Sequence, residues 1–446
     1  AIILSTVASG GLDFILVREI SRAPENAGTY VGSAILLKAG LALVVLLGLA
    51  GIGCLAGVAP PLRRALWIAT LANLARIHER SCVSVFRAMG KMAREGAVLA
   101  LQGAMYALTL IVAVAWIRDA GDAFLALLGS YLVSLSVGVV LMLHLGVRPR
   151  LTGALSAGRF LGREALPVGV AAVLAYLYER LPILALQVFR GASEVALFSG
   201  AFGLVRNTGV VPLVLSGAAL PVLSRLAPHA RPRLERTYGA IARLLLALSL
   251  PVAIALVLLA EPTMRLVFGA EYVAGYRVLQ VSAASIVLYF LAFLAKAGLE
   301  ATNQQGRWTR VLAASTLGGI ALQVGCISWL GLEGAAIGLV AADALVLALA
   351  MHALRRRVTV PWAGGGAFAA KCLAAGGVMA AVLGGSRGVY PAVRLLVAGM
   401  AYLATLVALR GLSDEEVAFA RSVFRRDRGP KVAEAMVGRG NGPEVG

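Results

Sequence analysis

The sequence predicts an all-α protein that crosses a membrane many times, and three observations lead to this fold class. Of its 446 residues 60% are hydrophobic, and the mean hydropathy is +0.86. Only 14% of the residues are charged, whereas a soluble domain has about 25%. The apolar residues also come in long blocks instead of amphipathic stripes. Blocks of about 20 such residues match a hydrocarbon core roughly 30 Å thick.

Thirteen apolar blocks predict membrane-spanning helices. We place these spans at 1–17, 34–57, 65–86, 96–117, 123–145, 165–188, 195–222, 239–260, 277–298, 309–330, 335–353, 367–385 and 392–410. Residues 1–150 would form an N-terminal bundle with five helices of an expected six. A basic cytoplasmic linker (151–164) would lead to a six-helix bundle (165–355), then to two additional transmembrane helices (366–410) and a basic cytoplasmic tail (411–446). Because the chain starts inside an apolar run without a methionine, we expect one more helix before it.

Two pairs of segments repeat at nearly constant spacing. "SGGLDFILVR" (9–18) aligns with "SGAALPVLSR" (216–225), an offset of 207. "AMGKMAREGAVLA" (88–100) aligns with "ATNQQGRWTRVLA" (301–313), an offset of 213. Both pairs fall at the same kind of predicted helix end, which indicates a duplicated bundle. Since six helices per half is an even number, the two halves would insert in the same orientation, with a central site between them.

The basic charge is distributed as a topology signal. The net charge is +19, and most Lys and Arg residues fall in loops that alternate along the chain, such as "GVRPRLTGALSAGRFLGRE" (146–164) and "LRRRVTVPW" (354–362). This is the positive-inside pattern, so we place these loops in the cytoplasm. Contact with anionic membrane lipids is a secondary use of the same charge. We expect no nucleic acid partner.

The sequence predicts no catalytic residue, metal or organic cofactor. The four cysteines lie singly in apolar segments, which does not favour a metal site or a disulfide. No GxxxxGK[ST] motif occurs, so nothing indicates direct use of ATP. Coupling to H⁺ or Na⁺ is left open.

Several charged residues lie within predicted spans, although a charge at mid-membrane costs about 2.5–3.5 kcal/mol. They are Arg76, Glu79, Arg80, Glu179, Arg180, Arg206 and Asp343. One interpretation is that ion pairs hold helices together, Arg76 with Glu79 and Glu179 with Arg206. The other is that the first six line a hydrated central cavity and bind substrate. Four Arg against three carboxylates favour an anion such as phosphate, because the guanidinium fork matches its oxygens.

Three residues are candidates for coupling or for a gate: Arg18, His78 and Asp343. Arg18 ends the first predicted span, and Asp343 lies near the middle of the span at 335–353. His78 lies next to Glu79 and could relay protons. The alternative for His78, a packed or hydrogen-bonded side chain, is the more common role of such a histidine.

Several motifs carry a resemblance to a known family. "GLDFILVREISR" (11–22), "LPVLSRLA" (220–227), the Phe-Gly-x-x-Tyr turn at 268–272 and "LEATNQQGR" (299–307) stand in the order found in bacterial polysaccharide exporters. The chain thus resembles the flippases for lipid-linked oligosaccharides, members of the multidrug/oligosaccharidyl-lipid/polysaccharide exporter superfamily. The resemblance implies fourteen helices. It also implies an acidic residue at Glu179 and cavity arginines at Arg180 and Arg206, with Arg18 as the basic residue that ends the second helix.

The function implied by the resemblance is translocation of a polyprenyl-diphosphate-linked oligosaccharide of the O-antigen type. We expect this in the inner (cytoplasmic) membrane of a bacterium, for polysaccharide or lipopolysaccharide biosynthesis, beside other polysaccharide-assembly proteins. One alternative is a cation-coupled multidrug antiporter of the same fold. A second is a membrane polysaccharide polymerase or glycosyltransferase, but the longest predicted outside loop, 261–276, is too short for a catalytic lobe. We therefore expect a transporter and no enzyme.

Overall fold

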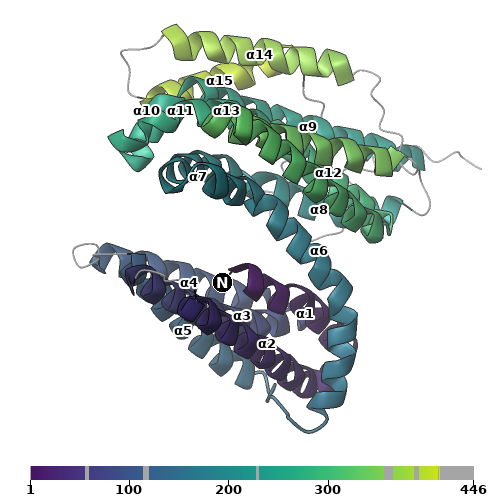
Figure 1. Cartoon of the computed structure of the whole chain (residues 1–446). Helices are drawn as coiled ribbons and strands as arrows, with labels where there is room; N and C mark the ends of the chain where they lie inside the picture. Colours follow the sequence, from purple (N-terminus) through teal and green to yellow (C-terminus); the bar gives the residue numbers. More distant parts are fainter. Residues whose placement is uncertain are drawn as a thin grey trace, which may run out of the picture. The chain divides into compact units, whose positions relative to one another are not determined.

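The computed structural model describes residues 2–55, 60–113, 120–227, 231–355, 365–385, 391–409 and 411, and the secondary structure within them is entirely helical (Figure 1). The α-helices are α1 (Ile2–Arg22), α2 (Ala27–Leu55), α3 (Pro60–Ala88), α4 (Met92–Ala113), α5 (Ala120–Leu143), α6 (Ala154–Phe189), α7 (Ala192–Asn207), α8 (Val210–Leu226), α9 (Arg231–Leu258), α10 (Ala260–Phe268), α11 (Tyr276–Ser282), α12 (Ala284–Ala301), α13 (Gln305–Arg355), α14 (Gly365–Gly385) and α15 (Pro391–Ala408). Short 3₁₀ turns lie at Pro24–Asn26 and Ala270–Gly275. The predicted tail, apart from Gly411, lies outside the described residues.

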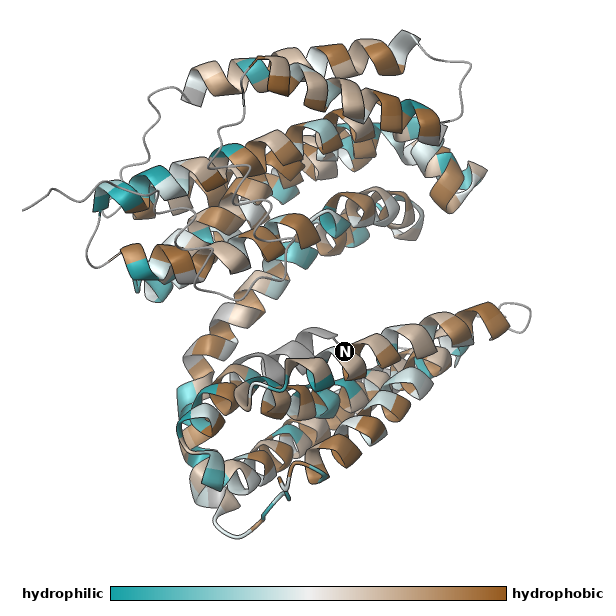
Figure 2. Cartoon of the chain, turned by 180° about the vertical axis from the view of Figure 1, so that it is seen from behind, coloured by the Kyte–Doolittle hydropathy of each residue, from teal (hydrophilic) through white to brown (hydrophobic). Residues whose placement is uncertain are grey.

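Nine helices within the described ranges are long and apolar enough to cross a membrane. Figure 2 shows the hydrophobic residues of these helices over both parts of the chain. Helix α3 is not among the nine, because charged residues are spread along it. Two of the nine candidates, Ala192–Leu226 and Gln305–Arg355, are 35 and 51 residues long. The predicted all-α membrane fold is confirmed.

The chain divides into two compact units, Ala1–Leu177 and Tyr178–Gly446, and the boundary falls inside α6. We call them unit 1 and unit 2. Helix α6 begins at Ala154, before the predicted start of its span at 165. Part of the predicted linker is therefore helical.

Unit 1 is built around α3, which packs against α1, α2, α4 and α5. Its apolar core includes Leu16, Ile20, Phe86 and Val98. The buried apolar side chains of α3, such as Phe86, explain why this helix is stable although it also carries charged residues. Burying one large apolar side chain contributes about 1.5–3 kcal/mol.

Two glycines of α2 allow the chain after α5 to cross that helix. A Cβ atom on Gly28 would lie 2.4 Å from the carbonyl oxygen of Arg148, and one on Gly32 would lie 2.1 Å from that of Arg150. The Arg150 N–H donates to the Gly28 carbonyl oxygen at 2.9 Å. Only glycine permits this approach. The basic segment is thereby fixed by its backbone, and its two arginine side chains remain exposed.

Unit 2 has its core among α7, α8, α9, α12 and α13, where Phe198, Leu245 and Phe290 are fully buried or nearly so. Helices α14 and α15 pack against each other and against α9. The Tyr402 hydroxyl of α15 donates to the carbonyl oxygen of Ala247 at 2.9 Å, which ties this outer pair to the core.

Helix α13 is a tight helical hairpin. Gly331 has φ 60° and ψ −131°, a conformation that breaks the helix. A Cβ atom on Gly334 would lie 2.0 Å from the carbonyl oxygen of Cys326, so the two arms touch directly beyond the turn. Further along, Gly319 faces Ala342. The two arms correspond to the predicted spans 309–330 and 335–353, so the sequence placed this turn correctly.

Two helix ends at the predicted repeat offset have the same backbone turn. After α3, the Lys91 N–H donates to the Phe86 carbonyl oxygen at 2.8 Å, and after α12 the Gln304 N–H donates to the Leu299 oxygen at 2.8 Å. Both turns contain one residue with positive φ, Gly90 at 67° and Asn303 at 56°. These are helix ends of the Schellman type. Each pair of equivalent residues is separated by 213 positions, the predicted offset.

Candidate functional site

A buried carboxylate on the second arm of α13 gathers donors from three other helices of unit 2. Asp343 accepts hydrogen bonds from the Tyr178 hydroxyl of α6 at 2.7 Å and from the Ser285 hydroxyl of α12. The Arg206 guanidinium of α7 reaches both carboxylate oxygens at 3.1 Å. Asp343 is only 3% exposed. We call these four residues the Asp343 cluster.

The Arg206 guanidinium is also held between two aromatic rings. Its central carbon lies 5.3 Å from the centre of the Phe202 ring and 5.1 Å from that of Tyr289. The Tyr289 hydroxyl in turn donates to the Val205 carbonyl oxygen at 3.0 Å and shares a hydrogen bond with Thr208. Cation–π contact favours a desolvated guanidinium. Arg206 is therefore fixed in position on three sides.

The ion pair in the Asp343 cluster differs from the pair that the sequence suggested. The partner of Arg206 is Asp343 and not Glu179. Glu179 and its neighbour Arg180 are both exposed on α6. Glu179 still acts electrostatically on Arg206. The structure thus brings two of the sequence-derived candidates together and leaves the adjacent acidic and basic pair accessible.

Unit 1 holds a second buried carboxylate, Glu79 of α3. The residue is 2% exposed, and its Oε1 accepts a hydrogen bond from the Ser134 hydroxyl of α5 at 2.5 Å. Arg76 and Arg80, on the same helix, both act on it electrostatically. Arg76 is half-buried, whereas Arg80 is exposed and forms no ion pair with a described carboxylate. These four residues form the Glu79 cluster.

A third polar group escaped the sequence analysis. The Lys38 ammonium of α2 is 0% exposed and has three oxygen partners. It donates to Asp13 Oδ1 of α1 at 2.6 Å, and to the Ile77 carbonyl oxygen and the Ser81 hydroxyl of α3, each at 2.8 Å. One signal was present in the sequence, because Lys38 is the only charged residue from 26 to 62. We call this the Lys38 cluster.

The remaining candidates lie in unit 1. Arg18, at the end of α1, donates to Glu19 at 2.7 Å and to Glu164 of α6 at 2.9 Å. The hydrogen bond with Glu164, followed by that with Glu19, raises the pKa of the Arg18 guanidinium above its ordinary value. His78 is half-buried on α3, next to the Glu79 cluster. Arg18 therefore links two helices, and His78 is no member of a hydrogen-bonded cluster in the described residues.

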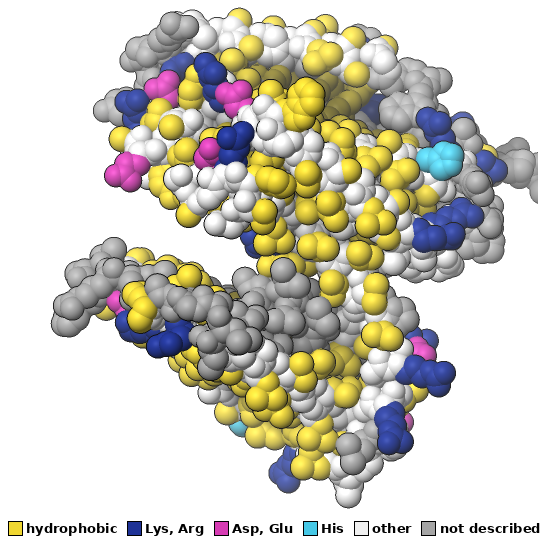
Figure 3. All heavy atoms as spheres, in the orientation of Figure 1, with side chains coloured by type: hydrophobic (Ala, Val, Ile, Leu, Met, Phe, Trp, Pro, Cys, Tyr) yellow, Lys and Arg dark blue, Asp and Glu magenta, His cyan; other side chains and the backbone are white. Residues whose placement is uncertain are grey.

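Charged side chains on the visible surface gather toward the ends of each unit, while hydrophobic side chains cover much of the area between (Figure 3). This distribution is expected of helices whose middle parts face lipid. The charged clusters that lie inside the helical spans are therefore the candidates for function. An ionisable residue within a membrane is costly unless it is paired or serves a function.

The comparisons with known proteins agree with this architecture. The family model described as "Polysaccharide biosynthesis protein" matches residues 83–275. The chain matches no protein of curated function in sequence. Its fold is similar to that of "Lipid II flippase MurJ, inward closed conformation", with a TM-score of 0.75 and 11% identity over 92% of this chain and 90% of that one.

Two other solved structures have the same fold. An inward-facing multidrug resistance MATE family transporter of the MOP superfamily has a TM-score of 0.68 and 16% identity, covering 80% of this chain and 87% of that one. A MOP superfamily transporter from Pyrococcus furiosus has a TM-score of 0.60 and 16% identity, covering 80% and 84%. The resemblance that the sequence motifs indicated is confirmed: this is a multi-pass membrane protein with the MurJ- and MATE-like fold, and its residues 83–275 match the polysaccharide biosynthesis protein family.

Proposed function

We propose that the protein is a flippase that moves a polyprenyl-diphosphate-linked oligosaccharide across the cytoplasmic membrane of a bacterium by alternating access. The observation that carries the proposal is the match of residues 83–275 to the polysaccharide biosynthesis family on a fold similar to that of a lipid II flippase. The matched segment includes the mid-span residues Glu179, Arg180 and Arg206. The product would serve cell-surface polysaccharide assembly.

The exposed arginines supply the chemistry for an anionic head group. Arg80 in unit 1 and Arg180 in unit 2 are exposed, although both lie within predicted spans. Contact of a guanidinium with lipid tails is costly, so each side chain should face hydrated space. A guanidinium binds phosphate oxygens through two parallel hydrogen bonds. In this proposal each of these arginines is a candidate to bind phosphate oxygens of the head group, while the prenyl chain stays in the bilayer.

Coupling to an H⁺ or Na⁺ gradient is part of the same proposal, and Asp343 is its candidate in unit 2. A proton or cation on this carboxylate would compete with Arg206 and release it from α13. Arg18 is the candidate gate, because it links α1 to α6 through Glu164. His78 remains a candidate relay by its position beside Glu79.

The adjacent residues Glu179 and Arg180 give a matched test of substrate charge. The purified protein is placed in liposomes with a fluorescent lipid-linked oligosaccharide, and exposure of the sugar on the opposite leaflet is measured. For an anionic substrate, Arg180→Gln should lower the rate about tenfold or more, the loss of one charge-assisted hydrogen bond, and Glu179→Gln should change it little.

The opposite result would identify a different transporter. The fold is also similar to that of multidrug transporters, and an antiporter of cationic drugs would depend on Glu179 and tolerate Arg180→Gln. The same liposomes are therefore loaded with a cationic dye, and dye efflux is measured under a pH or Na⁺ gradient. Dye transport without any movement of the oligosaccharide lipid would refute the flippase proposal.

A further inference from the structure

A cavity opens between the two arms of the α13 hairpin, near the end where the hairpin begins and finishes. Its volume is about 270 Å³. It is lined by Arg307, Arg310, Val311 and Ala314 of the first arm and by Leu349, His352 and Ala353 of the second. Pockets for drug-sized ligands usually span about 300–1,000 Å³. The cavity therefore suits a small polar head group more than a complete large ligand.

The polar side of this cavity carries only groups that can be cationic. Arg307 donates from Nη1 to the Gln304 amide oxygen at 2.5 Å, and Arg310 donates from Nε to the Gly306 carbonyl oxygen at 3.4 Å. These bonds hold the guanidinium groups but leave their other N–H donors available. Among the described residues, no carboxylate forms an ion pair with Arg307 or Arg310. Such a pair of arginines favours an anion with several oxygens.

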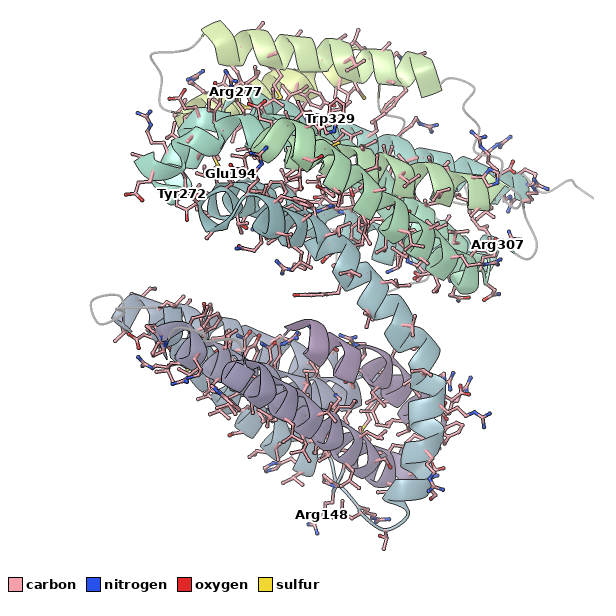
Figure 4. All side chains as sticks on the ribbon, in the orientation of Figure 1. Arg148, Glu194, Tyr272, Arg277, Arg307 and Trp329 are labelled. Atoms are coloured by element: carbon pink, nitrogen blue, oxygen red, sulfur yellow. The ribbon has the colours of Figure 1, made fainter. Side chains whose placement is uncertain are left out.

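The cavity lies at the basic end of unit 2. Arg307 is labelled at that end in Figure 4, where Figure 3 shows Lys, Arg and His side chains together. The opposite end, at the α13 turn, instead mixes signs, as in the pair of Arg277 with Glu333 at 3.4 Å. The positive-inside rule places the basic end in the cytoplasm. There the leaflet contains anionic lipids that attract basic residues.

The equivalent place in unit 1 carries different side chains. Arg94, which corresponds to Arg307 in the repeat, donates from Nη1 to the Leu141 carbonyl oxygen at 3.3 Å across α4 and α5. The positions equivalent to Arg310 and His352 are occupied by Ala97 and Val139. The basic cavity is therefore a property of unit 2 and no general consequence of the repeated fold. Unit 1 supplies a natural control.

We propose that this cavity binds the phosphate of an anionic phospholipid from the cytoplasmic leaflet, held by Arg307 and Arg310 with His352 on the facing arm. The apolar wall continues from Ala314 to Leu317, which is 71% exposed one turn further along α13. An acyl chain can follow this face into the bilayer. A bound phosphate would join the ends of the two arms and so stabilise the hairpin that carries Asp343.

The test measures lipid binding and needs no transport assay. Purified protein is placed in nanodiscs of phosphatidylcholine alone or with added phosphatidylglycerol, and bound lipid and melting temperature are recorded by native mass spectrometry and thermal unfolding. Phosphatidylglycerol should bind and raise the melting temperature. The double variant Arg307→Gln/Arg310→Gln should bind it on the order of 30-fold more weakly, since each charge near an anionic surface contributes about 1 kcal/mol.

Two further variants separate binding from folding. Arg307→Lys/Arg310→Lys keeps the charge and should retain most of the affinity. Arg94→Gln in unit 1 removes one arginine at the equivalent position and should leave phosphatidylglycerol binding unchanged. If the glutamine double variant keeps the lipid-induced shift, or if Arg94→Gln loses it equally, the assignment of this cavity is wrong.

Two other probes identify the source of the phosphate. Inorganic phosphate in phosphatidylcholine nanodiscs should give no shift, and a shift equal to that of the lipid would overturn the lipid assignment. A short prenyl diphosphate should bind no more tightly than phosphatidylglycerol. Strong preference for the diphosphate would instead make the cavity a substrate site, which would contradict a structural phospholipid and leave the proposed flippase function intact.

Discussion

The two units share one type of helix end at the predicted repeat offset, but they use their charged residues differently. In unit 2 the charges of Arg206 and Asp343 meet each other and are enclosed by hydroxyl groups and rings. In unit 1 Glu79 is buried, yet Arg80 beside it is exposed and has no carboxylate partner among the described residues. The charges of the Asp343 cluster are paired with each other, whereas the Glu79 cluster keeps an accessible cation. The comparison therefore asks which of the two clusters holds helices together and which can bind an anion.

The repeat itself shows where the chemistry diverged. At the offset of 213, Arg76 of α3 corresponds to Tyr289 of α12, and Ser130 of α5 corresponds to Asp343 of α13. Unit 2 therefore has an aromatic ring where unit 1 has a guanidinium, and a carboxylate where unit 1 has a hydroxyl. The helix ends after α3 and α12 share one backbone turn, because that turn depends on backbone hydrogen bonds and a positive φ, while the polar groups could change independently.

The largest effect on stability is expected from Asp343→Ala. The change removes the acceptor of three donors and leaves the half-buried Arg206 side chain without its carboxylate, and a guanidinium cannot lose its proton. Breaking a buried pair in this way costs about 3–5 kcal/mol. Unfolding of the purified protein in mixed micelles should show this loss.

A double variant tests whether the cost comes from the stranded charge. Replacing both partners, Arg206→Met with Asp343→Leu, should recover most of the stability, because two apolar side chains need no partner. If the double variant transports normally, the pair holds helices and has no part in binding or coupling. A stable but inactive double variant would assign it a functional role.

A smaller loss is expected from Asp13→Ala in the Lys38 cluster. The ammonium keeps the Ile77 carbonyl oxygen and the Ser81 hydroxyl as acceptors, and a buried lysine can release its proton, unlike an arginine. The cost should therefore fall near the lower limit for a broken buried pair, about 3 kcal/mol. The same unfolding assay measures it. A loss greater than that of Asp343→Ala would contradict this ranking.

A prediction for Ser134→Ala concerns the hydrogen bond that holds Glu79. Removing the hydroxyl leaves one oxygen of a buried carboxylate without its donor, which costs about 1.5–3 kcal/mol for a charged group. Arg76 and Arg80 offset part of this loss electrostatically, so a value near 1.5 kcal/mol is expected. Ser130→Ala is the matched control, since among the described residues the Ser130 hydroxyl bonds only to the carbonyl oxygen of Leu127 in the same helix.

Hydropathy was sufficient to predict the all-helical membrane fold and the two spans that form the arms of α13, but not the division of the spans 195–222 and 277–298 into two helices each. The pairings inside the spans were not predictable, because they depend on which helix faces which. Arg206 could have met Glu179 or Asp343, and only the packing of α7 against α13 decided for Asp343. Lys38 was overlooked because its apolar neighbours dominate any average over the span. The hydroxyl donors Tyr178, Ser285 and Ser134 are uncharged, so a search for charged residues within the spans does not find them.

Among these variants, Arg80→Gln should change stability the least and transport the most. Arg80 is exposed and has no described ion pair, so its loss should change the free energy of unfolding by less than about 0.5 kcal/mol.

Arg87→Gln, on the same helix, is the control: its partner Glu95 lies at the helix end. If Arg80 binds the diphosphate, its loss should reduce oligosaccharide translocation about tenfold or more, equal to one charge-assisted hydrogen bond, while Arg87→Gln stays near the rate of the unchanged protein. Equal rates for the two variants would remove the anion site from unit 1. A clear loss for Arg80→Gln alone would assign the anion site of unit 1 to the Glu79 cluster.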